Sequence, residues 1–120
     1  MKCCQAESVC VPLGTGPVLL ARVTFNSGNL ITEATVDEIS YVVMRGATEV
    51  GDDTLLVADV VHDTLQQDAT RWKIDKVGFN FEFDLPHTLL TGEDIYEVEV
   101  TISPVSGNPA ILKWEVAVSN

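Results

Sequence analysis

Hydrophobic and polar residues alternate along most of this chain, and a period of two predicts β-strands. The clearest segment is 79–85, where three phenylalanines and a leucine share one face and Asn80, Glu82 and Asp84 share the other. Segments 95–102 and 111–118 repeat the alternation. Inward-facing residues of three such strands should pack together. The predicted core therefore contains Phe81, Phe83, Val98, Val100, Trp114 and Val116.

Three further strands are expected, at 18–25, 39–45 and 54–61. Gly51-Asp52-Asp53 would separate the last two, and Pro104 to Pro109 has the composition of a hairpin loop. Thr64 to Thr70 is the only stretch that could be helical, for one turn at most, and 71–76 could be a short strand or a linker. Six or seven short strands with almost no helix predict an all-β protein, an antiparallel sandwich or barrel.

One local feature favours the sandwich. Leu89-Leu90-Thr91-Gly92 is followed by Tyr96-Glu97-Val98-Glu99-Val100, which is similar to the corner between strands E and F of an immunoglobulin-like sandwich. In that corner a tyrosine hydrogen-bonds to backbone a few residues upstream, and Tyr96 holds its place. The alternative is that Tyr96 is simply a core aromatic. We expect an immunoglobulin-like antiparallel β-sandwich of about seven strands in residues 17–120.

Residues 1–16 are expected to form an extended arm outside the core, ending in Gly14-Thr15-Gly16-Pro17. Polar residues interrupt any apolar stretch after Lys2, so no signal peptide is expected. The arm holds Cys3, Cys4 and Cys10. An odd number of cysteines in a chain without a signal favours free thiols over an inter-chain disulfide or a metal site.

Two predicted strands are apolar on both faces. Ile39, Tyr41 and Val43 oppose Val42 and Met44, and 54–61 shows the same property. An isolated sandwich needs only one apolar face per strand, so the second face should be covered by the 1–16 arm, by the 62–76 connection or by another subunit. The predicted subunit interface consists of Tyr41, Val43, Leu55, Val57 and Val61.

Composition limits the partners. The 120 residues include 7 Lys plus Arg and 18 Asp plus Glu, for a net charge of -11. Such a surface disfavours nucleic acid and anionic lipid, because both require positive charge. No apolar run approaches the ~20 residues of a membrane-spanning helix. We expect one domain that forms homo-oligomers or binds other proteins, with no nucleic-acid partner and no membrane insertion.

The search for chemistry predicts no enzyme, cofactor or metal. His62 and His87 have no nucleophile context such as Gly-x-Ser-x-Gly, and the acidic pairs match no calcium-loop spacing. Trp72, between Arg71 and Lys73, could stack on a sugar or a base. A tryptophan that fills the end of the sandwich is the favoured interpretation.

Segments 18–25, 26–29 and 39–45 and the Leu89–Val100 region together resemble small bacterial and bacteriophage immunoglobulin-like domains, over roughly residues 17–119. That resemblance implies a non-catalytic role and carries over no functional residues. The leading hypothesis is a bacteriophage or prophage virion protein, such as a capsid decoration or tail accessory subunit, assembled in the host cytoplasm. The alternative is a cell-surface or carbohydrate-binding module that uses Trp72 and the end loops.

Overall fold

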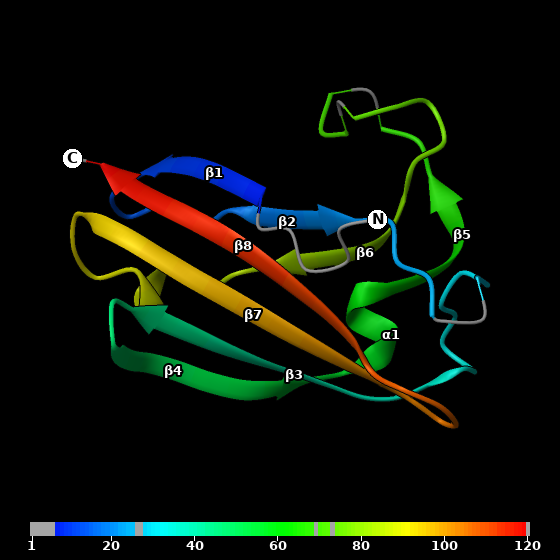
Figure 1. Cartoon of the computed structure of the whole chain (residues 1–120). Helices are drawn as coiled ribbons and strands as arrows, with labels where there is room; N and C mark the ends of the chain where they lie inside the picture. The colour runs from blue at the N-terminus through cyan, green and yellow to red at the C-terminus, as the bar shows by residue number, and fades with distance from the viewer. Residues whose placement is uncertain (1–6, 26–27, 69, 73, 120) are drawn as a thin grey trace.

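The chain forms two β-sheets that pack face to face (Figure 1). The computed structural model describes residues 7–25, 28–68, 70–72 and 74–119. One sheet has five strands in the order β1-β8-β7-β3-β4, and the other has three in the order β2-β6-β5. All described pairings are antiparallel except that of β1 with β8. The strands are β1 (Glu7–Pro12), β2 (Val18–Ala21), β3 (Val36–Arg45), β4 (Thr48–Leu55), β5 (Val61–Gln66), β6 (Phe79–Asp84), β7 (Asp94–Pro104) and β8 (Ala110–Ser119).

The predicted core is confirmed. All six of its predicted members are at most 3% exposed and belong to one buried cluster between the sheets. Phe81 of β6 stacks on Trp114 of β8, with ring centroids 6.0 Å apart. Tyr41 of β3 meets Phe83 at 4.9 Å. Aromatic pairs therefore join the two sheets, and each ring contributes a large buried area.

The two edge strands of the larger sheet, β1 and β4, differ from the sequence prediction. Residues 7–12 are strand β1, and Val11 is buried in the core, so the expectation of an arm lying outside the core is wrong for these residues. Gly51-Asp52-Asp53 lies inside β4 rather than between strands. The true turn before β4 contains Gly46, whose φ of 62° suits glycine. Edge strands tolerate charge and glycine, which hides β4 from a search for alternation.

The segment 54–61 is not one strand. β4 ends at Leu55, a single helical turn α1 (Val57–Val60) follows, and β5 begins at Val61. Residues 64–66 belong to β5, so the helix considered at Thr64–Thr70 is not present there. The carboxylate of Asp68 instead accepts bonds from the backbone N–H and hydroxyl of Thr70, which fixes a turn. The loop expected between Pro104 and Pro109 does connect β7 with β8.

Candidate functional site

Three of the five predicted interface residues lie in the core and the other two pack against it, so that part of the prediction is wrong. Tyr41, Val43 and Val61 are at most 8% exposed, and Leu55 and Val57 pack against the same cluster. The face of β3 that holds Tyr41 and Val43 is the inner one. The helical turn α1 breaks the period of two between Leu55 and Val61, so the side-chain directions derived from a continuous strand do not apply.

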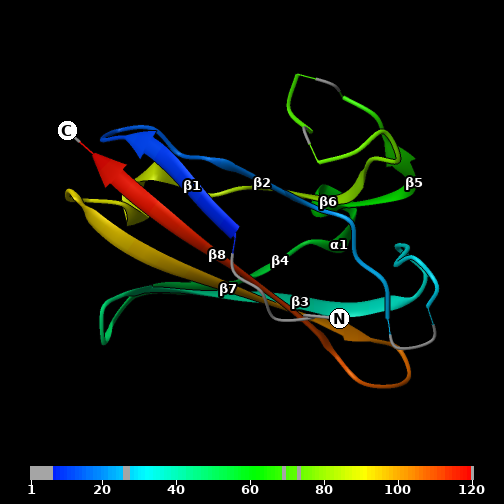
Figure 2. The same ribbon diagram turned by 45° about the horizontal axis from the view of Figure 1, so that its top comes forward.

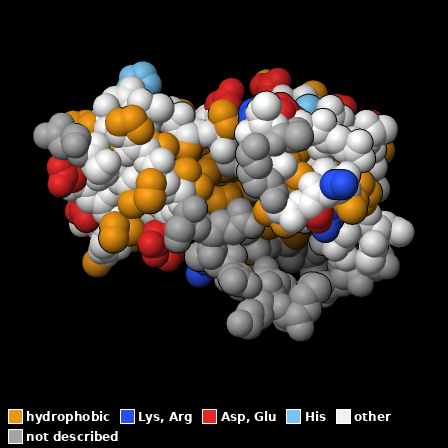
Figure 3. Space-filling view, turned by 90° about the horizontal axis from the view of Figure 1, so that it is seen from above, with side chains coloured by type: hydrophobic (Ala, Val, Ile, Leu, Met, Phe, Trp, Pro, Cys, Tyr) orange, Lys and Arg blue, Asp and Glu red, His pale blue; other side chains and the backbone are white. Residues whose placement is uncertain are grey.

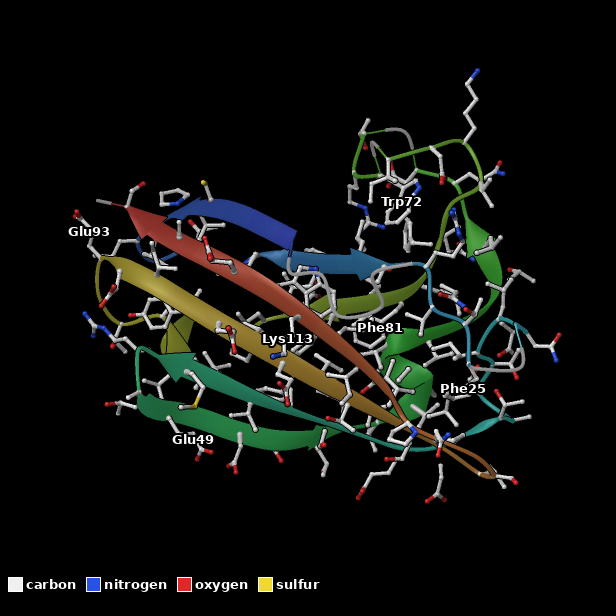
Figure 4. The ribbon with its side chains drawn as sticks, viewed as in Figure 1. Phe25, Glu49, Trp72, Phe81, Glu93 and Lys113 are labelled. Carbon is white, nitrogen blue, oxygen red and sulfur yellow. The ribbon has the colours of Figure 1, made fainter. Side chains whose placement is uncertain are left out.

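The outer face of the five-stranded sheet is acidic. Glu97 lies between Glu115 on β8 and Met44 on β3, and Glu99 lies between Lys113 and Val42 in the next row. Lys113 reaches Glu99 at 3.5 Å, and Figure 4 shows its side chain over this sheet, with Glu49 on β4. Val42 and Met44 are half-buried among these neighbours. Acidic side chains therefore surround the second apolar face of β3.

The outer face of the three-stranded sheet has a cover made by its own chain. We call residues 67–78 the covering loop (Figure 4). Trp72 of this loop packs with Leu20 of β2 and Phe79 of β6 in a second buried cluster, and its ring lies 5.8 Å from that of Phe79. The covers considered from the sequence concerned the second face of the strand at 39–45, which belongs to the other sheet, so this contact does not decide between them. Trp72 is 7% exposed, which agrees with a packing role.

The carboxylate of Asp75 organises the covering loop. Its Oδ1 accepts hydrogen bonds from the Trp72 indole at 3.0 Å and from the backbone N–H groups of Val77 and Gly78. Arg22, just after β2, pairs with Oδ2 at 2.8 Å. These donors, the Trp72 indole first and Arg22 next, hold the pKa of Asp75 well below its usual range. The loop is thus tied to β2 through one ionised side chain.

A second ionic group holds the other end of the loop. Arg71 donates to Asp68 at 2.8 Å and to Glu82 of β6 at 2.7 Å, and His62 of β5 contacts Glu82 at 2.9 Å. Arg71 and then His62 lower the pKa of the Glu82 carboxyl. Arg71 also lies 5.5 Å from the centroid of the Phe79 ring. Each side chain of this ionic group therefore has a partner within the group.

Tyr96 makes the predicted hydrogen bond to upstream backbone. Its hydroxyl donates to the Gly92 carbonyl at 2.9 Å and accepts the Gly92 N–H at 3.1 Å, and the side chain is fully buried. Arg45 lies over the ring at 5.6 Å and donates to Asp94 at 2.9 Å. The hydrogen bond to upstream backbone distinguishes this tyrosine from a simple core aromatic.

The four sheet edges differ in charge. We call the side formed by β1 and β2 the β1–β2 rim. No charged residue or histidine occurs from Ser8 to Ala21, although the chain carries a net charge of -11. By contrast, edge strand β4 carries Glu49, Asp52 and Asp53, and β5 carries His62 and Asp63.

The β1–β2 rim also exposes apolar side chains. Leu13 is 43% and Val18 40% exposed, and the thiol of Cys10 is exposed and free. Figure 2 shows β1 and β2 along the same side, and Figure 3 shows hydrophobic side chains gathered over it. Sequence reasoning missed this surface because it treated 1–16 as an arm. The uncharged run from Ser8 to Ala21 was the available signal.

The remaining candidate residues from the sequence analysis are His87 and the cysteines of the N-terminal segment. His87 is exposed at the start of a short 3-10 turn, and Cys3 and Cys4 lie outside the described residues. Among the described residues, no three His, Cys, Asp or Glu side chains are grouped to bind a metal ion. No helix in the described part is long and apolar enough to cross a membrane. Neither the protein-family models nor the curated proteins include a match to this chain.

Proposed function

We propose that this chain is an immunoglobulin-like β-sandwich that acts by assembly, as a subunit of a bacteriophage or prophage virion. The strand order supports the fold. The set β2-β6-β5 corresponds to strands B, E and D, and β8-β7-β3 corresponds to G, F and C, with β4 as an added edge strand. The hydrogen bond between Tyr96 and Gly92 adds the tyrosine corner. One departure is that β1 joins β8 rather than β2.

The observation that carries the assembly proposal is the run without charge from Ser8 to Ala21 along the β1–β2 rim. An exposed sheet edge is a template for pairing, and proteins that remain monomeric protect such edges with charge. Here the protected edge is β4, whereas the β1–β2 rim exposes Leu13 and Val18 beside strand edges that pair with no other described strand. The resemblance to small bacteriophage domains supports the virion as the place where that surface is used.

Trp72 gives no support to the carbohydrate-binding alternative. Its ring is covered and its indole N–H donates to Asp75, so the residue expected to stack on a sugar is occupied within the chain.

The assembly proposal is tested by placing charge on the rim. Val18→Glu should lower the molar mass measured by light scattering at high protein concentration, while circular dichroism stays unchanged. Ile111→Glu is the matched control, because Ile111 is 37% and Val18 40% exposed, yet Ile111 lies on the outer face of β8. A wild-type chain that remains monomeric at every concentration would contradict assembly.

The virion proposal needs a separate measurement. Particles released from the source strain after prophage induction can be purified on a density gradient and analysed by peptide mass spectrometry. The chain should be present in constant ratio to the major capsid or tail protein across the particle fractions. Its absence from purified particles would overturn the virion role and leave assembly untouched.

A further inference from the structure

We propose that two copies of this chain associate through β1, with the two β1 strands antiparallel about a two-fold axis at Val9. The two five-stranded sheets then form one continuous sheet. This inference rests on the proposed assembly function and names its partner, a second copy. The argument depends on which backbone groups of β1 are open, on side-chain facing and on charge.

The open backbone groups of β1 can be identified from one hydrogen bond. The N–H of Leu13 donates to the Ser119 carbonyl of β8 at 2.7 Å. Backbone groups of successive residues in a strand point in opposite directions, so Val9 and Val11 also direct theirs towards β8. The backbone groups of the alternate residues, Ser8, Cys10 and Pro12, therefore point away from the sheet. Proline has no N–H, and the Pro12 carbonyl already accepts the N–H of Thr15 at 3.1 Å. Within the described part of the chain, Ser8 and Cys10 are the residues of β1 left to pair.

Side-chain facing limits the register. Val9 and Val11 face the core, and Cys10 is exposed on the other side. Residues directly opposite each other in an antiparallel pair share a face, so the axis must pass through a residue rather than between two. An axis at Cys10 or Val11 would oppose Pro12, which cannot donate. An axis at Val9 places Ser8 opposite Cys10 twice, and each such pair exchanges two N–H···O bonds.

Charge favours a second copy as the occupant. In this register Glu7 lies opposite Val11, so no two like charges are directly opposed. On β4 an axis at Asp52 or Asp53 would oppose that residue to its own copy, and an axis at Gly51 would oppose Asp53 to Glu49, which destabilises pairing. Each subunit has a net charge of -11, so the subunits repel at long range. Because salt screens that repulsion, dimerisation should strengthen as ionic strength rises.

Disulfide trapping tests the register. The test uses the full chain with Cys3→Ser and Cys4→Ser, so that Cys10 is the remaining thiol. Adding Ser8→Cys places a thiol opposite Cys10 of the second copy, with Cα atoms ~5.5 Å apart, which lies within disulfide range. Mild oxidation should convert most of the protein to a covalent dimer. The matched control combines Ser8→Cys with Cys10→Ser and should remain monomeric on denaturing gels.

A second variant tests the hydrogen bonds without a cross-link. Cys10→Pro removes a backbone N–H that points away from β8. The change therefore removes no hydrogen bond within the subunit, but it removes one hydrogen bond from each of the two Ser8–Cys10 pairs of the dimer. Sedimentation should show at least a tenfold weaker dimer at an unchanged melting temperature. The proposal would be overturned if the control cross-linked as efficiently as the Ser8→Cys variant. It would also be overturned if the Ser8→Cys variant did not cross-link in concentrated protein at high salt. A dimer absent from purified particles would overturn only the virion role, and particle incorporation without the dimer would overturn only this inference.

Discussion

The two buried clusters of this protein are stabilised in different ways. The cluster between the sheets consists of aliphatic and aromatic side chains and is enclosed by strands whose backbones are hydrogen-bonded to one another. The cluster of Leu20, Trp72 and Phe79 is closed on one side by the covering loop, which is held by the ionised side chains of Asp75, Arg71 and Glu82. Burial of apolar side chains is the main stabilisation of the first cluster, whereas the second also depends on particular charges. The comparison predicts that the two clusters respond differently to mutation and to pH.

The largest effect is expected in the cluster between the sheets. Phe81→Ala removes a fully buried ring that stacks on Trp114, and it should lower the free energy of unfolding by ~3–5 kcal/mol. Urea denaturation monitored by circular dichroism measures this loss. A decrease below ~1 kcal/mol would show that the contact between the sheets does not limit stability.

Trp72→Ala should cost less than Phe81→Ala. The expected loss is about 3 kcal/mol, at the low end of the range for large-to-small changes, because the loop can collapse into the space. Limited proteolysis should show new cleavage within 67–78 while the sheets remain intact. If Trp72→Ala destabilises the whole domain as much as Phe81→Ala, the two clusters form one cooperative unit.

Asp75→Asn separates the charge of the covering loop from its packing. The amide keeps the size of the side chain but loses the ion pair with Arg22 and half of the acceptor capacity. Hydrogen exchange at the N–H groups of Val77 and Gly78 should accelerate, with little change in the strands. Asp94→Asn is the control, because Asp94 also pairs with an arginine but lies outside the loop. Equal acceleration in both variants would contradict a local role for Asp75.

The smallest effect is the response to acid. The fold lowers the pKa of Glu82, chiefly through Arg71, so its ionisation stabilises the fold above the unfolded-state pKa of about 4.3. That contribution is lost as the pH falls through the lower folded-state value. In Trp114→Phe, which leaves Trp72 as the only tryptophan, fluorescence should shift to longer wavelength before circular dichroism changes. Glu82→Gln should remove this early step, and coincident transitions in the parent would contradict it.

The sequence predicted the parts of the fold where one physical requirement dominates. β6, β7 and β8 each have one face in the core, so their alternation identified Phe81, Val98 and Trp114 correctly. Tyr96 was placed by the spacing between Gly92 and the strand that follows. In these segments local pattern and final environment agree.

Prediction failed where a residue pattern had two possible causes. Val57 and Val61 looked like two positions of one strand, but a single helical turn lies between β4 and β5. Phe79 is two residues from Phe81 and was expected on the same face of the strand. It packs under Trp72 instead, because the covering loop supplies a second apolar environment. A loop that folds back is a tertiary feature and leaves no periodic signal. The run without charge from Ser8 to Ala21 marks the β1–β2 rim in the sequence, but its place in the fold follows only once β1 is known to join the sheet.

The parallel pairing of β1 with β8 also sets the order in which the molecule can be completed. β1 is made well before its partner strand, because Glu7 pairs with Trp114, 107 positions (114 − 7) further along the chain. Contacts so distant in sequence form late and slowly. Until they form, Val9 and Val11 have no sheet to join, and the backbone groups of Ser8 and Cys10 have no fixed direction. The proposed pairing edge therefore exists only on finished subunits, which protects nascent chains from associating before they have folded.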